Sequence, residues 1–216
     1  MELFLPVQFI IKKLLIIFFI SSFSFSSHSN ELAVNDFGII TIMYHRFEEN
    51  KYPSTNIRMA EFQKHLEIIK DNEIKFINPT NFEEELTNNK EQRKLLLTID
   101  DGYKSFYDNA WPILKNSEIP FILFVSTREV GKPGYMTWRE IKEISAYKFV
   151  EIGNHSHTHE YLIDYTNEEI KEDLQKSISI FKKELGKNSE FFSYPFGEYS
   201  KNLKKIVIDL GFKYAF

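Results

Sequence analysis

The sequence predicts a mainly parallel α/β fold, either a barrel or a doubly wound sheet. Short apolar runs of strand length alternate with amphipathic segments of helical spacing, and no large insertion interrupts this alternation. The runs are rich in β-forming residues or continuously apolar, which suits strands buried on both faces. In both folds ligands bind at the carboxyl ends of the strands, so we expect functional residues directly after the strand runs.

Seven runs are predicted to be strands because they are short, apolar and rich in β-branched or aromatic residues. They cover residues 38–44, 74–77, 94–99, 120–125, 148–152, 190–194 and 213–216.

The helices between these strands have recognisable starts. Residues 58–71 place Phe62, Leu66 and Ile69 on one face, and His65 is expected on the exposed surface. Three segments begin with the Ser/Thr-x-x-Glu pattern of a capping box. The pattern begins at Thr80, Thr137 and Thr166, and the last segment ends before Gly186, a typical helix stop.

The composition excludes several classes of protein. The 216 residues favour one domain, and 43% hydrophobic residues are enough to build a core. A net charge of −4 argues against a nucleic-acid-binding face. The chain has no cysteine, which excludes disulfides, thiolate metal ligands, a cysteine nucleophile and an acylated cysteine.

The first 30 residues have the pattern of a secretory signal peptide. Lys12 and Lys13 precede the apolar run 14–20, and a serine-rich stretch follows. The alternative is an uncleaved membrane anchor, since residues 7–25 are almost wholly apolar. We therefore assign residues 1–30 as a signal peptide or N-terminal anchor and 31–216 as the functional domain. This assignment predicts a secreted or periplasmic protein, with membrane association if the leader is retained.

Two adjacent carboxylates, Asp100 and Asp101, end the strand run 94–99 and precede Gly102. Neighbouring side chains of a strand point to opposite faces, but a chain that turns at the glycine can bring both to one site. Two such charges repel each other unless one is protonated or a cation binds. The alternative is a simple Asp-Gly turn, with Asp100 capping the next helix.

Three histidines, His155, His157 and His159, follow the strand run 148–152. If the chain is helical here, the first and third share one face and the second does not. If it is extended, all three point the same way. Two imidazoles and a carboxylate form a suitable ligand set for Zn²⁺. The alternative is a polar loop without a ligand.

Two further segments follow predicted strands. In 193–199, Pro195 and Gly197 predict a turn that aims the backbone N–H of Phe196 or Gly197 into the site. In 43–47, Tyr44 and His45 follow the first strand. Each of these residues has a packing role as its alternative.

Taken in order, the Asp-Asp-Gly, His-Ser-x-x-His and Pro-Phe-Gly segments resemble the polysaccharide deacetylase (NodB-homology) family of carbohydrate esterases. The resemblance covers about residues 38–216. Met-Tyr-His-Arg and Tyr-Pro-Phe-Gly-Glu-Tyr are similar to the branch that deacetylates exported poly-N-acetylglucosamine. The resemblance implies an incomplete, distorted (β/α) barrel. The chain ends in an apolar run that looks like a strand just begun, so we expect it to be a truncated copy of a longer protein.

The resemblance also implies roles for individual residues. A divalent metal, often Zn²⁺ in this family, would be bound by Asp101, His155 and His159. Asp100 would be the general base and Phe196 would supply a backbone N–H to the oxyanion. The residues expected to support the site or the substrate are Ser156, Tyr44, His45, Tyr194 and Pro195.

The chain departs from the family pattern at two places. The family often has arginine where Ser193 stands. Its catalytic-acid histidine lies in a later Leu-x-His motif, but no histidine follows His159. Either the chain stops before that motif, which we favour, or His45 or His157 takes its place. His157 occupies a variable position and is expected at the rim of the site rather than as a ligand.

The expected function is metal-dependent N-deacetylation of an extracytoplasmic N-acetylglucosamine polymer by a monomer that binds no nucleic acid. One alternative is another amide or ester substrate, such as peptidoglycan, acetylated xylan or a cyclic amide. A second is a catalytically impaired carbohydrate-binding relative. A periplasmic metal-binding protein is a third, but it leaves the Asp-Asp-Gly run unexplained.

Overall fold

The computed structural model of the chain describes residues 38–87 and 92–216. Its main sheet has seven strands, all paired in parallel. All seven predicted strands are confirmed. They are β1 (Ile39–Tyr44), β4 (Lys75–Phe76), β5 (Lys94–Ile99), β6 (Phe121–Val125), β7 (Val150–Asn154), β8 (Phe191–Phe192) and β9 (Tyr214–Ala215).

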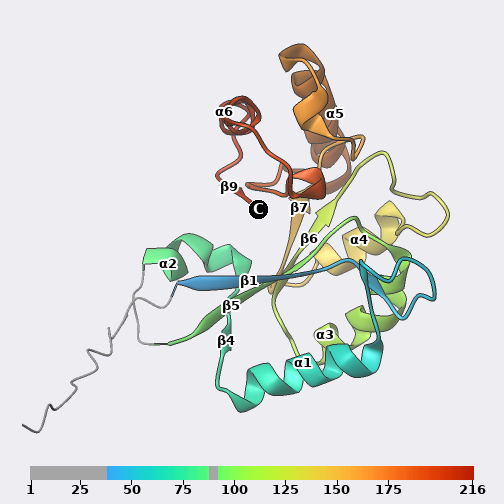
Figure 1. Cartoon of the computed structure of the whole chain (residues 1–216), viewed down its shortest axis with the longest axis vertical. Helices are drawn as coiled ribbons and strands as arrows, with labels where there is room; N and C mark the ends of the chain where they lie inside the picture. Colours follow the sequence, from blue (N-terminus) through green and yellow to red (C-terminus); the bar gives the residue numbers. More distant parts are fainter. Residues whose placement is uncertain (1–37, 88–91) are drawn as a thin grey trace, which may run out of the picture. The chain divides into compact units, whose positions relative to one another are not determined.

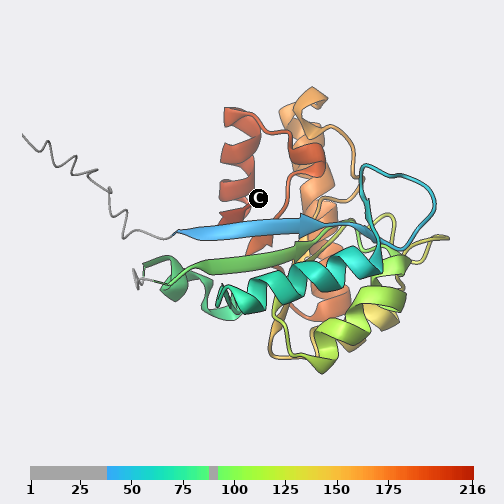
Figure 2. The same cartoon turned by 60° about the horizontal axis from the view of Figure 1, so that its bottom comes forward.

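The strand order is β1-β5-β6-β7-β8-β9, with β4 also paired to β5. From β5 onward the order follows the chain without the reversal that defines a doubly wound sheet. The sheet curls, so that β7 runs at a steep angle to β1 and β5 (Figures 1 and 2). The fold is therefore an incomplete parallel barrel, and the doubly wound alternative is wrong.

Helices α1, α3 and α4 lie on the outer side of the curled sheet beside β4–β7, and α5 and α6 lie beside β7–β9 (Figure 1). Helix α2 instead packs against the inner face through Phe82. The sequence prediction missed α3, α6 and a small second sheet of β2 (Arg46–Phe47) and β3 (Asn56–Ile57). The helices are α1 (Met59–Asp71), α2 (Phe82–Thr87), α3 (Trp111–Asn116), α4 (Trp138–Ser145), α5 (Asn167–Leu185) and α6 (Lys201–Asp209).

Two of the three predicted capping boxes are confirmed. Thr137 and Thr166 accept from the backbone N–H three residues on, and the glutamate at that position accepts from the cap. The box at Thr80 is wrong. The side chain of Asn78 caps a 3₁₀ turn, Pro79–Asn81, and α2 begins only at Phe82.

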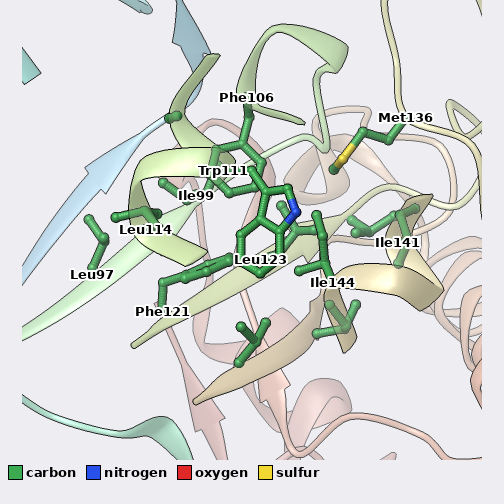
Figure 3. Close-up of a cluster of buried hydrophobic side chains, with 14 of the residues drawn as sticks. Leu97, Ile99, Phe106, Trp111, Leu114, Phe121, Leu123, Met136, Ile141 and Ile144 are labelled. Atoms are coloured by element: carbon green, nitrogen blue, oxygen red, sulfur yellow. The ribbon is translucent and has the colours of Figure 1, made fainter. Parts of the chain in front are cut away.

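The two faces of the sheet carry separate apolar cores. Leu97, Ile99 and Phe121 face outward and pack against α3 and α4 through residues such as Trp111 and Ile144 (Figure 3). The inner face carries a second cluster, closed by the ring of Phe82 from α2. Its buried members are Ile77, Phe82, Leu96, Ile122, Phe124 and Phe191.

The alternation of side chains along each strand decides which residues face the barrel interior. Leu96 and Ile122 lie inside, so Asp100 and Ser126, four residues further on, continue the inner rows beyond the strand ends. The register pairs Tyr44 with Ile99, Val125 with Asn154, and Asn154 with Phe192. One edge of the barrel is consequently formed by the residues that follow these strands: His45, Asp100, Ser126, His155 and Ser193.

In the part of the chain that the structure describes, no helix has the length and apolar character needed to cross a membrane. The predicted leader, residues 1–30, lies outside the described residues. Its role as a signal peptide or anchor stays a prediction.

Candidate active site

A left-handed turn after β5 brings both carboxylates to the same place. Asp101 and Gly102 each have a φ of 71°, a conformation that aspartate tolerates better than most residues. The Asp100 N–H donates to the Tyr44 carbonyl at 2.8 Å and so continues the β1–β5 ladder. Asp100 Oδ2 then lies 3.9 Å, and Asp101 Oδ1 3.4 Å, from Nε2 of His155.

His155 is held with one ring nitrogen facing these carboxylates. Its Nδ1 lies 2.8 Å from the Ser193 carbonyl oxygen. Because a carbonyl only accepts, Nδ1 carries a proton, and Nε2 is the ring nitrogen that faces the carboxylates, the orientation found in metal-binding histidines.

The histidine loop, residues 155–159, is neither helical nor extended, so neither conformation considered from the sequence is correct. Ser156 and His159 have φ values of 65° and 54°. These two left-handed residues fold the loop back, and the rings of His155 and His159 come to 4.8 Å between centroids. The Ser156 hydroxyl accepts from the His159 N–H at 3.0 Å.

One oxygen and two nitrogens converge on one point. Asp101 Oδ1 lies 2.9 Å from His159 Nε2 and 3.4 Å from His155 Nε2, and the three ligand atoms lie within 4.8 Å of one another. Two ligands of a tetrahedral Zn²⁺ would lie about 3.3 Å apart, from metal–ligand distances near 2.0–2.1 Å. Asp101 Oδ1 is buried and has no hydrogen-bond partner among the described residues. The residues present therefore fit a divalent cation.

The pKa values of the adjacent carboxyl groups move in opposite directions. Burial raises the pKa of Asp100, although the charges of His155 and His45 and the Ser193 hydroxyl oppose it. Burial also acts to raise the pKa of Asp101, but the imidazoles of His155 and His159 outweigh it and hold that pKa well below its usual range. Two neighbouring carboxyl groups whose pKa values are shifted in opposite directions are typical of catalytic sites.

Ser193 contacts two members of the site, a role that the sequence did not reveal. Its hydroxyl donates to Asp100 Oδ2 at 3.0 Å, and its carbonyl accepts from His155. The side chain is buried. A small residue at the end of β8 thus orients Asp100 at the position where the family often has arginine.

Tyr44 and His45, the two residues predicted near the site at the end of β1, lie in different surroundings. His45 follows Tyr44, which pairs with Ile99, so His45 lies beside Asp100 at the same edge of the barrel. The side chain of Tyr44 instead faces α1, where its hydroxyl is hydrogen-bonded to Nδ1 of His65 at 2.7 Å and its ring packs edge-on against Phe62. Only the Tyr44 carbonyl reaches the site, through the Asp100 N–H.

The segment after β8 borders the site through Phe196. Its φ is 60°, and its half-exposed ring packs edge-on against His159 and stacks on Tyr161 at 3.9 Å. Tyr194 and Pro195 are buried, and Tyr194 packs against Phe192. The oxyanion role of the Phe196 N–H stays a prediction.

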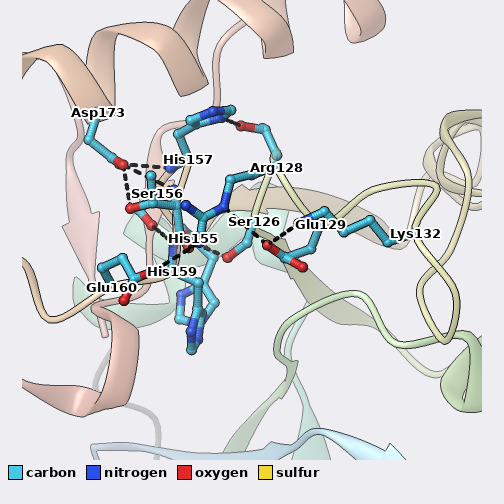
Figure 4. A network of polar contacts seen from close by, with 12 residues as sticks. Ser126, Arg128, Glu129, Lys132, His155, Ser156, His157, His159, Glu160 and Asp173 are labelled. Carbon is cyan, nitrogen blue, oxygen red and sulfur yellow. Dashed lines mark hydrogen bonds and ion pairs between the residues drawn. The ribbon is translucent and has the colours of Figure 1, made fainter.

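The third histidine is neither a member of the ligand group nor a rim residue, so the rim prediction is wrong. His157 is buried, and its Nδ1 is hydrogen-bonded to the Thr127 hydroxyl at 2.8 Å. Its ring lies on the opposite side of the loop from those of His155 and His159 (Figure 4). Burial lowers the pKa of His157. We conclude that it anchors the loop to the β6–α4 connection.

An incomplete parallel barrel with a two-histidine, one-aspartate group at its carboxyl edge defines an α/β protein of the barrel type, with its site in the usual place for that fold. The model of the polysaccharide deacetylase family matches residues 87–215. The chain belongs to this family, and the resemblance seen in the motifs is confirmed.

Two relatives in sequence support this assignment. The Bacillus subtilis protein YxkH, named for the same family, is 25% identical over 174 residues, which cover 80% of this chain and 61% of that protein. A poly-β-1,6-N-acetyl-D-glucosamine N-deacetylase of Staphylococcus aureus is 25% identical over 175 residues, covering 74% and 60%. The chain thus spans about three fifths of the length of these relatives.

Solved structures share the fold. IcaB from Ammonifex degensii superposes with a TM-score of 0.75 at 27% identity, covering 81% of each chain. The Streptococcus pyogenes deacetylase PplD gives a TM-score of 0.72 at 24% identity, also covering 81% of each chain. The predicted incomplete barrel of the deacetylase type is therefore confirmed.

Proposed function

We propose that this chain is a metal-dependent hydrolase that removes N-acetyl groups from an N-acetylglucosamine polysaccharide outside the cytoplasm. The observation that carries the proposal is the convergence of a buried Asp101 oxygen and two imidazole nitrogens on one point, beside a second buried carboxylate. The S. aureus relative named for poly-β-1,6-N-acetyl-D-glucosamine supports the choice of polymer. We further propose that residues 1–30 export or anchor the domain formed by residues 31–216, and that this domain works as a monomer.

Asp101, His155 and His159 would hold the cation. We propose Zn²⁺, because two imidazoles and one carboxylate are a common ligand set of catalytic zinc, with a position left for water and substrate. A divalent cation supplies Lewis-acid polarisation of a carbonyl oxygen and lowers the pKa of water.

Asp100 is proposed as the general base. Ser193 holds its Oδ2, while its Oδ1 is buried and has no hydrogen-bond partner among the described residues. Asp100 takes a proton from the water as the water oxygen attacks the acetyl carbon. The Phe196 N–H donates to the developing oxyanion, a contact worth about 3–4 kcal/mol in hydrolases.

The carbon–nitrogen bond then breaks, releasing acetate, and the departing amine takes up a proton. Asp100, protonated in the first step, and His45 are the groups we propose for this transfer, since both follow paired strand ends at the same edge. His157 is unsuited, because its ring faces away from His155 and His159.

Acetate release from β-1,6-linked N-acetylglucosamine oligomers tests the function. We expect Zn²⁺-dependent release by the purified chain and its loss in Asp100→Asn, which keeps the size of the side chain but cannot act as the base. Release that persists in this variant would exclude Asp100 as the base. Glycan binding without acetate release would favour the carbohydrate-binding alternative, and release only from peptidoglycan, acetylated xylan or cyclic amides would redirect the substrate assignment.

A further inference from the structure

Asp173 of helix α5 binds the histidine loop through its carboxylate, which accepts hydrogen bonds from two backbone N–H groups and one hydroxyl of the loop. Its Oδ1 accepts from the His157 N–H at 2.8 Å. Its Oδ2 accepts from the N–H and the hydroxyl of Thr158, at 3.0 and 2.6 Å. Asp173 as a whole is 6% exposed. A buried charge is costly unless hydrogen bonds satisfy it, and here the donors come from the two residues preceding His159.

A second contact lies one turn further along the same helix. The Ser177 hydroxyl donates to Asn154 Oδ1 at 2.7 Å, and the same oxygen accepts from the Ser156 N–H at 3.0 Å. Ser177 and Asn154 are fully buried. Because residues four apart share a helix face, Asp173 and Ser177 contact the loop from one side of α5.

The histidine loop has a strained backbone conformation that these contacts can stabilise. Ser156 and His159 occupy left-handed conformations that residues other than glycine disfavour. Such a loop persists only if its surroundings impose it, and its fold-back is what brings the rings of His155 and His159 together. The N–H groups of His157 and Thr158 donate to the Asp173 carboxylate. The N–H of Ser156 donates to the Asn154 side chain, which Ser177 also contacts.

We propose that Asp173 and Ser177 are positioning residues that hold the histidine loop in the conformation its cation ligands require. The proposal rests on the proposed function for the role of the cation, whereas the hydrogen bonds themselves are present without one. Helix α5, which supplies none of the proposed ligands, thereby controls the affinity of the site for its cation.

The decisive variant is Asp173→Asn in the full chain. The amide keeps the shape and one acceptor, but its NH₂ group then faces a donor of the loop. We expect the affinity for Zn²⁺, measured by competition with a chromophoric chelator, to fall about 10–100-fold, the range typical when partners of metal ligands are replaced. The visible absorption of the Co²⁺-loaded protein should change with it, because it reports the coordination geometry.

The matched control is Glu169→Gln, one turn earlier on α5. Glu169 also accepts from a backbone N–H and a hydroxyl, both of Thr166, at 2.7 and 2.8 Å. This variant loses the same kind of carboxylate outside the histidine loop and should bind Zn²⁺ as the wild type does. Thr158→Val should weaken binding in the wild type but add little in the Asp173→Asn background, since both changes break the same hydrogen bond.

Amide hydrogen exchange in the metal-free protein separates this proposal from the proposed function. We expect the N–H groups of residues 156–159 to exchange about tenfold faster in Asp173→Asn than in Glu169→Gln. Faster exchange in a protein that binds no Zn²⁺ would overturn the metal function and leave the positioning role intact. Unchanged exchange and Zn²⁺ affinity within threefold of the wild type would overturn the positioning role. If Asp173→Asn does not fold, Ser177→Ala and Thr158→Val decide by the same two measurements.

Discussion

Gly153 sits where the barrel interior leaves no room for a side chain, so Gly153→Ala should destabilise the fold and disturb the site together. A Cβ at this position would lie 2.2 Å from Cδ1 and 2.3 Å from Cε1 of Phe124, and 3.0 Å from Cγ2 of Ile122. Ordinary contact begins at 3.4 Å, so the aromatic ring must retreat by more than 1 Å. Phe124 is fully buried, and its neighbours include His155 and Phe216.

Overpacking of this kind costs about 1–3 kcal/mol. For a chain of this size, 1 kcal/mol shifts the melting temperature by about 2–4 °C, so we expect a fall of about 2–12 °C. Because the Phe124 ring lies 6.4 Å from that of His155 between centroids, moving it should disturb His155 and lower the affinity for Zn²⁺ as well. Combining Gly153→Ala with Phe124→Leu removes the clashing ring atoms and should restore part of both losses.

Thermal denaturation followed by circular dichroism and chelator competition for Zn²⁺ measure the two effects. Gly38→Ala is the control, because a Cβ there meets nothing within 4 Å. A Gly153→Ala protein that melts within about 1 °C of the wild type and binds Zn²⁺ normally would refute both the tight interior and its link to the site.

Three further predictions concern the site and its surroundings. His155→Ala combined with His159→Ala should abolish stoichiometric Zn²⁺ binding, measured by elemental analysis, and metal retained by this variant would show that the ligands are wrong. Ser193→Ala should lower kcat about 10–100-fold while leaving Zn²⁺ affinity unchanged, since it removes a hydrogen bond to Asp100 worth about 1.5–3 kcal/mol but keeps the carbonyl that holds His155; a parallel loss of Zn²⁺ would contradict this separation. Burial acts to raise the pKa of Glu140, but the Lys104 ammonium and the N–H and hydroxyl of Thr137 hold that pKa below its usual value. Its stabilising contribution is therefore present above about pH 4.3 and lost as the pH falls through the lower folded pKa, so urea denaturation of Glu140→Gln should show a weaker acid dependence than that of the wild type.

Local signals explain which elements of the fold could be predicted. The central strands β5 and β6 are buried along their whole length and consist mainly of apolar residues, so each is visible within its own residues. The edge strand β1 is recognisable from its apolar residues although Ile40 and Met43 are exposed. The box at Thr80 failed because Asn78 caps the preceding 3₁₀ turn and takes the Thr80 N–H for itself. Helix α3 lacked a visible start because a π-helical turn, Phe106–Ala110, leads into it without a cap.

The position of the site could be predicted, whereas the conformation of its loop could not. Asp100, His155 and Ser193 each follow a parallel strand, and such strand ends meet at one edge whatever the loops do. The left-handed conformations within 155–159 depend on residues far along the chain. Asp173 and Ser177 lie more than ten positions after the loop, and no periodicity within the histidine segment reveals them.

The adjacent carboxylates show how one dipeptide can serve two purposes. Asp100 continues the inward-facing row of β5 and reaches Ser193, whereas Asp101, one residue later, should face away if the strand continued. The left-handed turn at Asp101 cancels that alternation and directs its carboxylate to two imidazoles. The backbone therefore separates the environments of two identical side chains, and their opposite pKa shifts follow from it. Exchanging either one for asparagine should consequently remove a different function: proton transfer at Asp100 and cation affinity at Asp101.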